Sequence, residues 1–338
     1  MKQLEKNLFM IALPLPQSPM REIICYLIRG QHRHLLVDTA FNLDECEQSL
    51  MRQLDEIGVK IEDTDIFITH RHIDHCGLIG RLKREQNTIY ASATDKEAID
   101  AGQTNAHHVR IAAFLAYTGI PEQYRLAPES HVATTLNSDR LVDITPLSGG
   151  AKLSVGDFNF EVIEVPGHSP GHLALWEPEK KYLFSGDHIL EDISPNITAW
   201  DLTVNYLELY TESLKKVREM PVCKLFPAHR ATPTDINGRI DQLIQHHHDR
   251  SEAIIQNLKA ADRPMTAYDI ALLLEWNVRT PLLQNQRQPR SSTCTESLPH
   301  LQLQLWFACM ETLAHLQNLR FKSKVQCEEQ GAVLYFSV

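Results

Sequence analysis

The chain has 338 residues and a mass of 38.6 kDa, with 33 basic and 43 acidic side chains and a formal net charge of −10. Hydrophobic residues make up 43% and charged residues 22%, which excludes an intrinsically disordered chain. The acidic balance argues against bulk nucleic-acid binding. Seventeen histidines stand out, because histidine is the commonest metal ligand and a proton shuttle near neutral pH.

The cysteines argue against a disulfide scaffold. There are seven, widely spaced and without a C-x-x-C pair, so we expect a reducing compartment and a cytoplasmic protein. No run of 18 apolar residues is present, so we expect no membrane partner. The apolar stretch 8–13 ends at Pro14 and is too short for a secretory signal, so we expect a strand there.

Residues 1–235 predict an α/β (α+β) domain in which helices cover sheets, because short β-rich runs alternate with helical patterns. The expected strands are 8–13, 23–28, 35–38, 65–69, 88–91, 158–165, 172–176, 182–185 and 224–227. The expected helices are 43–57, 105–118 and 204–220.

The pattern changes near residue 236, and residues 236–338 predict a small second domain. The expected elements are a long helix with an apolar stripe at 240–258, a short helix at 267–274 capped by Thr266, a polar stretch at 284–300, a helix at 301–319 and a hairpin with strands at 324–327 and 332–337 around the turn Glu328–Gly331. This element order is that of a winged helix. Winged helices often bind nucleic acid, but residues 239–338 carry ten basic and ten acidic side chains. We therefore favour packing against residues 1–235 or, in a homodimer, against a second copy over a nucleic-acid partner.

The strongest chemical signal is the segment Thr69–His75, THRHIDH, which follows a predicted strand. His70 and His72 point to the same side, because side chains alternate along an extended chain. Asp74 and His75 fall where a helix is expected to begin, so they can point to a second position nearby. Three imidazoles and a carboxylate are costly to place there without partners, and they suit zinc, iron or manganese.

Three further candidates lie downstream, each where a predicted strand ends. His168 lies in VPGHSPGH, where proline and glycine predict a tight turn, Asp187 follows FSG, and His229 follows FPA. Each alone is compatible with an ordinary polar residue at a strand end. Together, in this order, they predict a site that is completed from several parts of the chain.

These segments together resemble the ordered motifs of the metallo-β-lactamase superfamily. The resemblance implies a four-layer αββα sandwich with two divalent metal ions at one edge, zinc first, with iron or manganese as alternatives. It implies that His70, His72 and His168 hold one metal, that Asp74, His75 and His229 hold the other, and that Asp187 bridges them. Asp38, at the end of an early strand, would accept a hydrogen bond from a ligand histidine and fix its tautomer.

Such a site implies metal-assisted hydrolysis, in which a hydroxide bridging the metals attacks the substrate and Asp74 orients it or passes its proton. β-Lactam hydrolysis is disfavoured, because the best-known β-lactamases carry cysteine where this chain has Asp187. The two-domain arrangement resembles the glyoxalase II-like, lactamase-like branch with a C-terminal winged helix. The expected small-molecule substrate is therefore an acyl ester, thioester first and lactone second. An RNA phosphodiesterase and a non-catalytic ligand sensor with a winged-helix partner domain are the alternatives.

Overall fold

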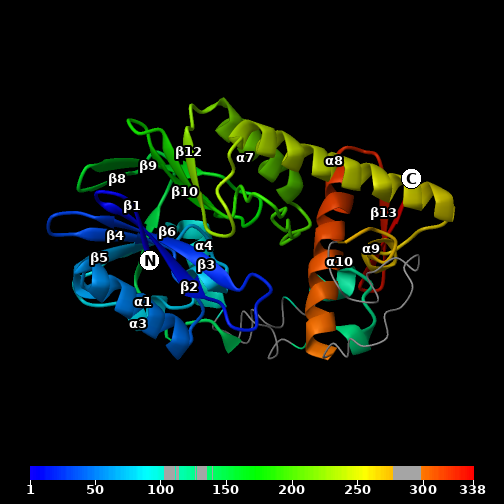
Figure 1. Cartoon of the computed structure of the whole chain (residues 1–338). Coiled ribbons are helices and arrows are strands. Elements are labelled where there is room, and N and C mark those ends of the chain that lie inside the picture. Colours follow the sequence, from blue (N-terminus) through cyan, green and yellow to red (C-terminus); the bar gives the residue numbers. More distant parts are fainter. Residues whose placement is uncertain (103–110, 112–113, 126, 128–134, 139, 277–297) are drawn as a thin grey trace, which may run out of the picture. The chain divides into compact units, whose positions relative to one another are not determined.

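The computed structural model describes residues 1–338 except 103–110, 112–113, 126, 128–134, 139 and 277–297. The chain divides into two compact units (Figure 1). Unit 1 comprises Met1–Thr104, Val132–Pro195 and Glu212–Ile240, and unit 2 comprises Asn105–His131, Asn196–Thr211 and Asp241–Val338. Because each unit combines separate segments, these bounds do not test the domain division predicted at residue 235, which stays a prediction.

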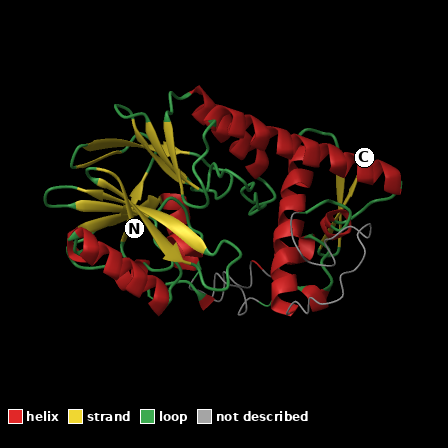
Figure 2. Cartoon of the chain, in the orientation of Figure 1, coloured by secondary structure: helices red, strands yellow, loops and turns green. Residues whose placement is uncertain are grey.

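Unit 1 contains two β-sheets (Figure 2). The first has seven strands, in the spatial order β1 (Lys2–Glu5), β2 (Leu8–Pro14), β3 (Glu22–Arg29), β4 (His34–Val37), β5 (Thr64–Phe67), β6 (Ile89–Ser92) and β7 (Ile144–Leu147). The second has five, in the order β12 (Lys224–Pro227), β11 (Tyr182–Gly186), β10 (Leu173–Glu177), β9 (Phe158–Glu164) and β8 (Lys152–Val155). The described α-helices of the chain are α1 (Asp44–Ile57), α2 (Ile73–Cys76), α3 (Ile79–Leu82), α4 (Ala93–Ala101), α7 (Tyr206–Glu219), α8 (Ile236–Ala261), α9 (Ala267–Ala271) and α10 (Leu298–Phe321).

The first sheet is buried on both faces, and β3 shows why. Alternate β3 residues, among them Cys25, pack in one apolar cluster with Leu50 and Leu54 of α1. The residues between them, among them Tyr26, pack in a second cluster with Phe184 and Phe226 of the other sheet. Because side chains of a strand alternate between its faces, one apolar strand supports both a helix layer and a sheet layer.

Helix α1 has the amphipathic pattern that the sequence predicts. Its buried residues include Cys46, Leu50 and Leu54, which recur at helical spacing. The helix ends at Gly58, whose φ of 74° lies in the left-handed region that favours glycine.

Three strands of unit 1, β1, β7 and β8, have no counterpart in the predictions. Their sequences KQLE, ITPL and KLSV are short and partly exposed, so they lack the continuous apolar character of a buried strand. The strand expected at 65–69 ends at Phe67, and the residues that follow form the turn into α2.

Unit 2 contains the predicted order of helices followed by a hairpin, β13 (Gln326–Gln330) and β14 (Val333–Ser337). Thr266 caps α9 as predicted, in a reciprocal capping box with Asp269. The turn predicted at 328–331 is wrong, because Glu328 and Glu329 pair with β14 and expose their side chains.

Parts of two predictions fall outside the described residues. They are most of the helix expected at 105–118 and most of the polar stretch at 284–300. Within the described part of the chain, no helix combines the length and apolar character needed to cross a bilayer.

Candidate metal centre

The seven predicted ligand residues all lie in unit 1, at the ends of strands from both sheets. The turn after β5 carries His70 and His72, and it leads into α2, which carries Asp74 and His75. His168 follows β9, Asp187 follows β11, and His229 follows β12. A chain reversal at each strand end therefore brings residues far apart in sequence to one edge.

The potential ligand atoms form three groups, and within each group they lie within 4.8 Å of one another. The groups are His70, His72 and His168; Asp74, His75 and His229; and His70, His75 and Asp187. The first two match the two ligand sets implied by the resemblance, and the third connects them.

Asp187 lies between the two histidine groups. Its Oδ2 is 3.5 Å from Nε2 of His75 and 3.6 Å from Nε2 of His168. Its Oδ1 is 3.6 Å from Nε2 of His229. A single carboxylate thus faces histidines of both groups, as the predicted bridging role requires.

The chemistry of these donors fits divalent metal ions. Asp187 Oδ1 and His75 Nε2 are buried and have no hydrogen-bond partner among the described residues. Contacts of 3.5–3.6 Å between Asp187 and the histidines are long for hydrogen bonds. Buried polar atoms need partners, and a metal ion held between them would satisfy several at once.

Hydrogen bonds at Nδ1 of two ligand histidines direct the Nε2 atoms of these rings toward this centre. Nδ1 of His75 lies 2.9 Å from Oδ2 of Asp38, and Nδ1 of His229 lies 3.0 Å from the Glu22 carbonyl oxygen. Each contact holds Nδ1–H as the donor and leaves Nε2 for a metal. Asp38 itself is 1% exposed and accepts hydrogen bonds from the backbone N–H and the hydroxyl of Thr69.

Burial and neighbouring charges together set the charge of the site residues. It lowers the pKa of His70 and His72 well below the usual value, with neighbouring histidines adding to the effect at both, so both rings are neutral, the form that binds metal. Burial opposes ionisation of Asp74, but His75 and His229 outweigh it and lower the pKa of Asp74 to about 2.

Residues 22–229 match the family model of the metallo-beta-lactamase superfamily. The chain belongs to this superfamily. A probable metallo-hydrolase of Bacillus subtilis, YqjP, is 22% identical over 98% of both chains. A metallo-beta-lactamase family protein from Thermus thermophilus has a solved structure with a TM-score of 0.80 and 26% identity, covering 99% of this chain and all of its own.

These comparisons confirm the predicted αββα superfamily fold and the class of metal-dependent hydrolase. Another relative of this chain is an atrochrysone carboxyl ACP thioesterase of Aspergillus fumigatus. The two are 23% identical over 72% of this chain and 46% of the thioesterase.

Two residues outside the predicted ligand set support the site; a supporting role is expected for His172 from its place beside a ligand, but not for Thr69. His172 stacks on His70, with ring centroids 4.7 Å apart and planes at 14°, and its Nε2 accepts the backbone N–H of Asp187 at 3.3 Å. Thr69 packs so closely on Gly186 that a Cβ there would lie 2.6 Å from the Thr69 hydroxyl. His172 has a sequence signal in the second histidine of GHSPGH, whereas Thr69 has none.

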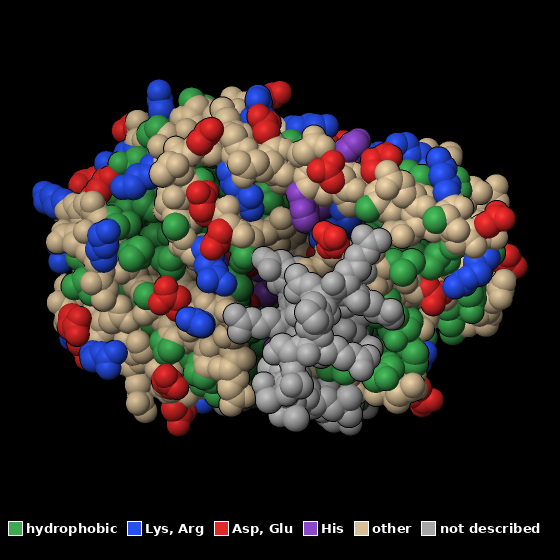
Figure 3. All heavy atoms as spheres, turned by 45° about the vertical axis from the view of Figure 1, so that its right-hand side comes forward, with side chains coloured by type: hydrophobic (Ala, Val, Ile, Leu, Met, Phe, Trp, Pro, Cys, Tyr) green, Lys and Arg blue, Asp and Glu red, His purple; other side chains and the backbone are tan. Residues whose placement is uncertain are grey.

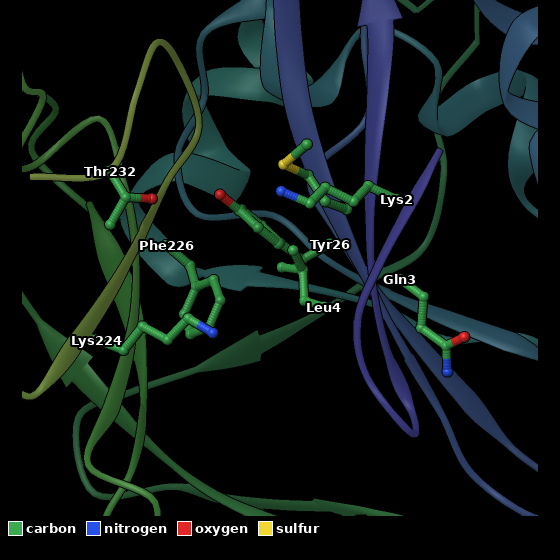
Figure 4. A pocket seen from close by; sticks show the side chains of 8 residues that line it. Lys2, Gln3, Leu4, Tyr26, Lys224, Phe226 and Thr232 are labelled. Carbon is green, nitrogen blue, oxygen red and sulfur yellow. The ribbon is translucent and has the colours of Figure 1, made fainter.

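The described cavity of unit 1 in Figure 4 is separate from these ligands. It has a volume of about 390 Å³, and Lys2, Tyr26, Lys224 and Phe226 are among its lining residues. The Tyr26 hydroxyl donates a hydrogen bond to the Pro227 carbonyl at 2.8 Å, which ties it to the strand rather than leaving it for a ligand. None of the seven predicted ligands lines this cavity.

Proposed function

We propose that this superfamily enzyme hydrolyses a small acyl thioester at a centre of two divalent metal ions, with zinc as the first candidate. The observation that carries the proposal is the position of Asp187 between two separate histidine groups. The thioesterase named among the relatives supports the thioester over other acyl compounds. A lactone, whose carbonyl carbon is attacked in the same way, is the second candidate.

The residues present divide the work of such a reaction. His70, His72 and His168 would hold one metal, and the group containing Asp74 would hold the other. When bound, a metal pair lowers the pKa of water and polarises the substrate carbonyl. Asp74 keeps 19% of its side chain exposed, more than the 10% of Asp187, so its carboxylate is the better placed of the two to orient an incoming water.

The C-terminal element order supports a winged-helix-like domain. Figure 3 shows basic and acidic side chains mixed over the described part of the visible face, and residues 239–338 have equal numbers of both. These observations favour a small-molecule substrate over RNA. The cytoplasmic location and a homodimer stay predictions, as does the absence of a membrane partner.

A substrate panel tests the proposal. Zinc-loaded protein would be assayed with acyl-CoA, an acylglutathione, a lactone and bis-p-nitrophenyl phosphate. We expect the highest kcat/KM for a thioester, and Glu179→Ala, an exposed change in the turn between β10 and β11, to retain it. Turnover of the phosphodiester alone would contradict the proposal and favour an RNA phosphodiesterase. No turnover of any compound would favour a ligand sensor.

A further inference from the structure

A buried carboxylate outside the ligand motifs lies in unit 1, in the first turn of α4. Asp95 is 0% exposed, and its backbone N–H donates to the N-cap hydroxyl of Ser92 at 3.0 Å. It occurs some twenty residues after the THRHIDH segment and more than seventy before His168, so no motif points to it.

The carboxylate of Asp95 bonds to both histidine-bearing loops. Its Oδ2 accepts the backbone N–H of Arg71 at 3.1 Å and the hydroxyl of Ser169 at 2.8 Å. Its Oδ1 accepts the backbone N–H of Gly171 at 3.1 Å. Arg71 is the residue between His70 and His72, and Ser169 directly follows His168. One side chain thus joins the two segments that supply the first ligand group.

The surroundings of this carboxylate supply the hydrogen-bond partners that it needs and pack closely around it. Burial raises the pKa of Asp95, and the positive charge of Arg71 and the hydrogen bonds to both loops oppose that rise. Three hydrogen bonds and the first turn of a helix are suitable partners for a buried carboxylate. A Cβ at Gly171 would lie 2.1 Å from the Ser92 hydroxyl and 2.8 Å from Oδ1 of Asp95. The backbone of Gly171, in the loop that carries His168, therefore lies directly against Asp95. The distance between this loop and the loop that carries His70 and His72 depends on the Asp95 side chain.

We propose that Asp95 is a positioning residue that sets the spacing of the two loops and thereby the affinity of the His70, His72 and His168 group for its metal. It touches neither metal nor substrate. This inference rests on the proposed function only in requiring a bound metal, and it does not depend on which substrate is hydrolysed.

Asp95→Asn tests the inference most directly. The amide keeps the size of the side chain but turns an NH2 toward groups that are themselves donors. Removing a direct hydrogen-bond partner of a metal ligand costs about 10–100-fold in affinity. Asp95 acts through the loops that carry the ligands, so we expect a loss toward the lower end of that range for one of two zinc ions, measured by competition with a chromophoric chelator. Asp100→Asn is the matched control, because Asp100 lies on the same helix and pairs with Lys96 at the surface.

Ser169→Ala is a milder variant in case Asp95→Asn does not fold. It removes one of the three hydrogen bonds to the carboxylate and should lower the binding affinity for the same metal ion by up to about tenfold. The absorption of Co²⁺ bound in the substituted enzyme gives a second readout, because it reports ligand geometry, and we expect it to change in both variants. The unfolding temperature of the metal-free protein should change little in Ser169→Ala.

The outcomes separate this inference from the proposed function. Wild-type affinity and Co²⁺ spectra in both Asp95→Asn and Ser169→Ala would overturn it. So would equal weakening of both metals accompanied by a large loss of metal-free stability, which indicates a general structural role. A wild-type protein that binds two metals but hydrolyses no thioester would sink the proposed substrate and leave the role of Asp95 to the affinity measurements.

Discussion

Two regions of the molecule bury histidines side by side, with different consequences. In unit 1, five histidines and two aspartates gather with their potential ligand atoms close together. In unit 2, His247 of α8 and His315 of α10 form a pair, with Nδ1 of His247 3.3 Å from Nε2 of His315. Nδ1 of His315 lies 2.9 Å from the Ser251 hydroxyl. The first region collects ligands, whereas the second is a hydrogen-bonded chain within a helix interface.

The difference lies in the neighbours of the rings. The unit 1 histidines face Asp74 and Asp187, whereas the groups that act electrostatically on His247 are His246 and Arg250, which carry no negative charge. Among the described residues, neither His247 nor His315 belongs to a group that could hold a metal. Burial of histidine alone is therefore no sign of a metal site, but burial beside shared carboxylates is.

Metal removal should have the largest effect and should act on the unit 1 centre. Treatment with a chelator removes the ions on which hydrolysis depends, so we expect activity to fall to background and to return when zinc is added. Binding at 100 times Kd stabilises a fold by about 2.7 kcal/mol, so the unfolding temperature should fall as well. Full activity in protein that metal analysis shows to be free of metal would contradict the site.

Asp38→Asn should give the next largest effect, because Asp38 holds the Nδ1–H of His75. We expect metal affinity to fall by about 10–100-fold, measured by chelator competition. Asp55→Asn, an exposed change on α1, is the control and should bind metal as the wild type does. Equal affinities in the two variants would show that Asp38 does not orient a ligand.

His247 should make stability depend on pH without changing metal affinity. Burial, with His246 and Arg250, lowers the pKa of His247 to about 3 from an ordinary value of 6.5. Between pH 6.5 and pH 3, the unfolded chain binds a proton at this histidine and the folded chain does not. The contribution of the neutral His247 ring to the free energy of unfolding is therefore complete above pH 6.5. It is lost as the pH falls toward 3, by at most about 1.4 kcal/mol per pH unit.

Urea unfolding of metal-free protein at pH 7 and pH 5 measures this dependence. In His247→Gln the loss of stability between the two pH values should shrink, while zinc affinity at pH 7 stays at the wild-type value. An unchanged pH dependence would show that His247 titrates normally, and weakened zinc binding would erase the distinction between the two regions.

Thr266→Ala should give the smallest effect, because it removes one helix cap in unit 2. Loss of such a cap costs about 1 kcal/mol, measured as a shift in the urea midpoint, and metal affinity should not change. The conservative variant Thr266→Ser keeps the hydroxyl and should restore most of the loss.

Most strands and helices, and the first segment of metal-ligand candidates, could be predicted from the sequence because their signals are local. The apolar strand of β3 and the helical spacing in α1 are visible in any short window. The THRHIDH segment carries four of the seven proposed ligands in six residues. Edge strands such as β1 and β8 were missed because partly exposed strands need no continuous apolar run.

Long-range contacts outside the superfamily motifs mark where prediction from the sequence ended. Asp95 reaches Ser169 across 74 positions, and no pattern near either residue announces the contact. The same holds for Thr69 against Gly186, which depends on how two strands from different sheets end beside each other. Such pairs are set by packing of the whole unit rather than by local propensity.

The metal content of the wild type and of Asp187→Ala tests the central claim most directly. Both proteins, loaded with zinc and dialysed, would be measured by elemental analysis beside Glu179→Ala. We predict two zinc ions per chain in the wild type and the control, and fewer than two in Asp187→Ala, with hydrolysis lost. Two tightly held zinc ions and full hydrolysis in Asp187→Ala would contradict the bridging role of this carboxylate and the two-metal centre built around it.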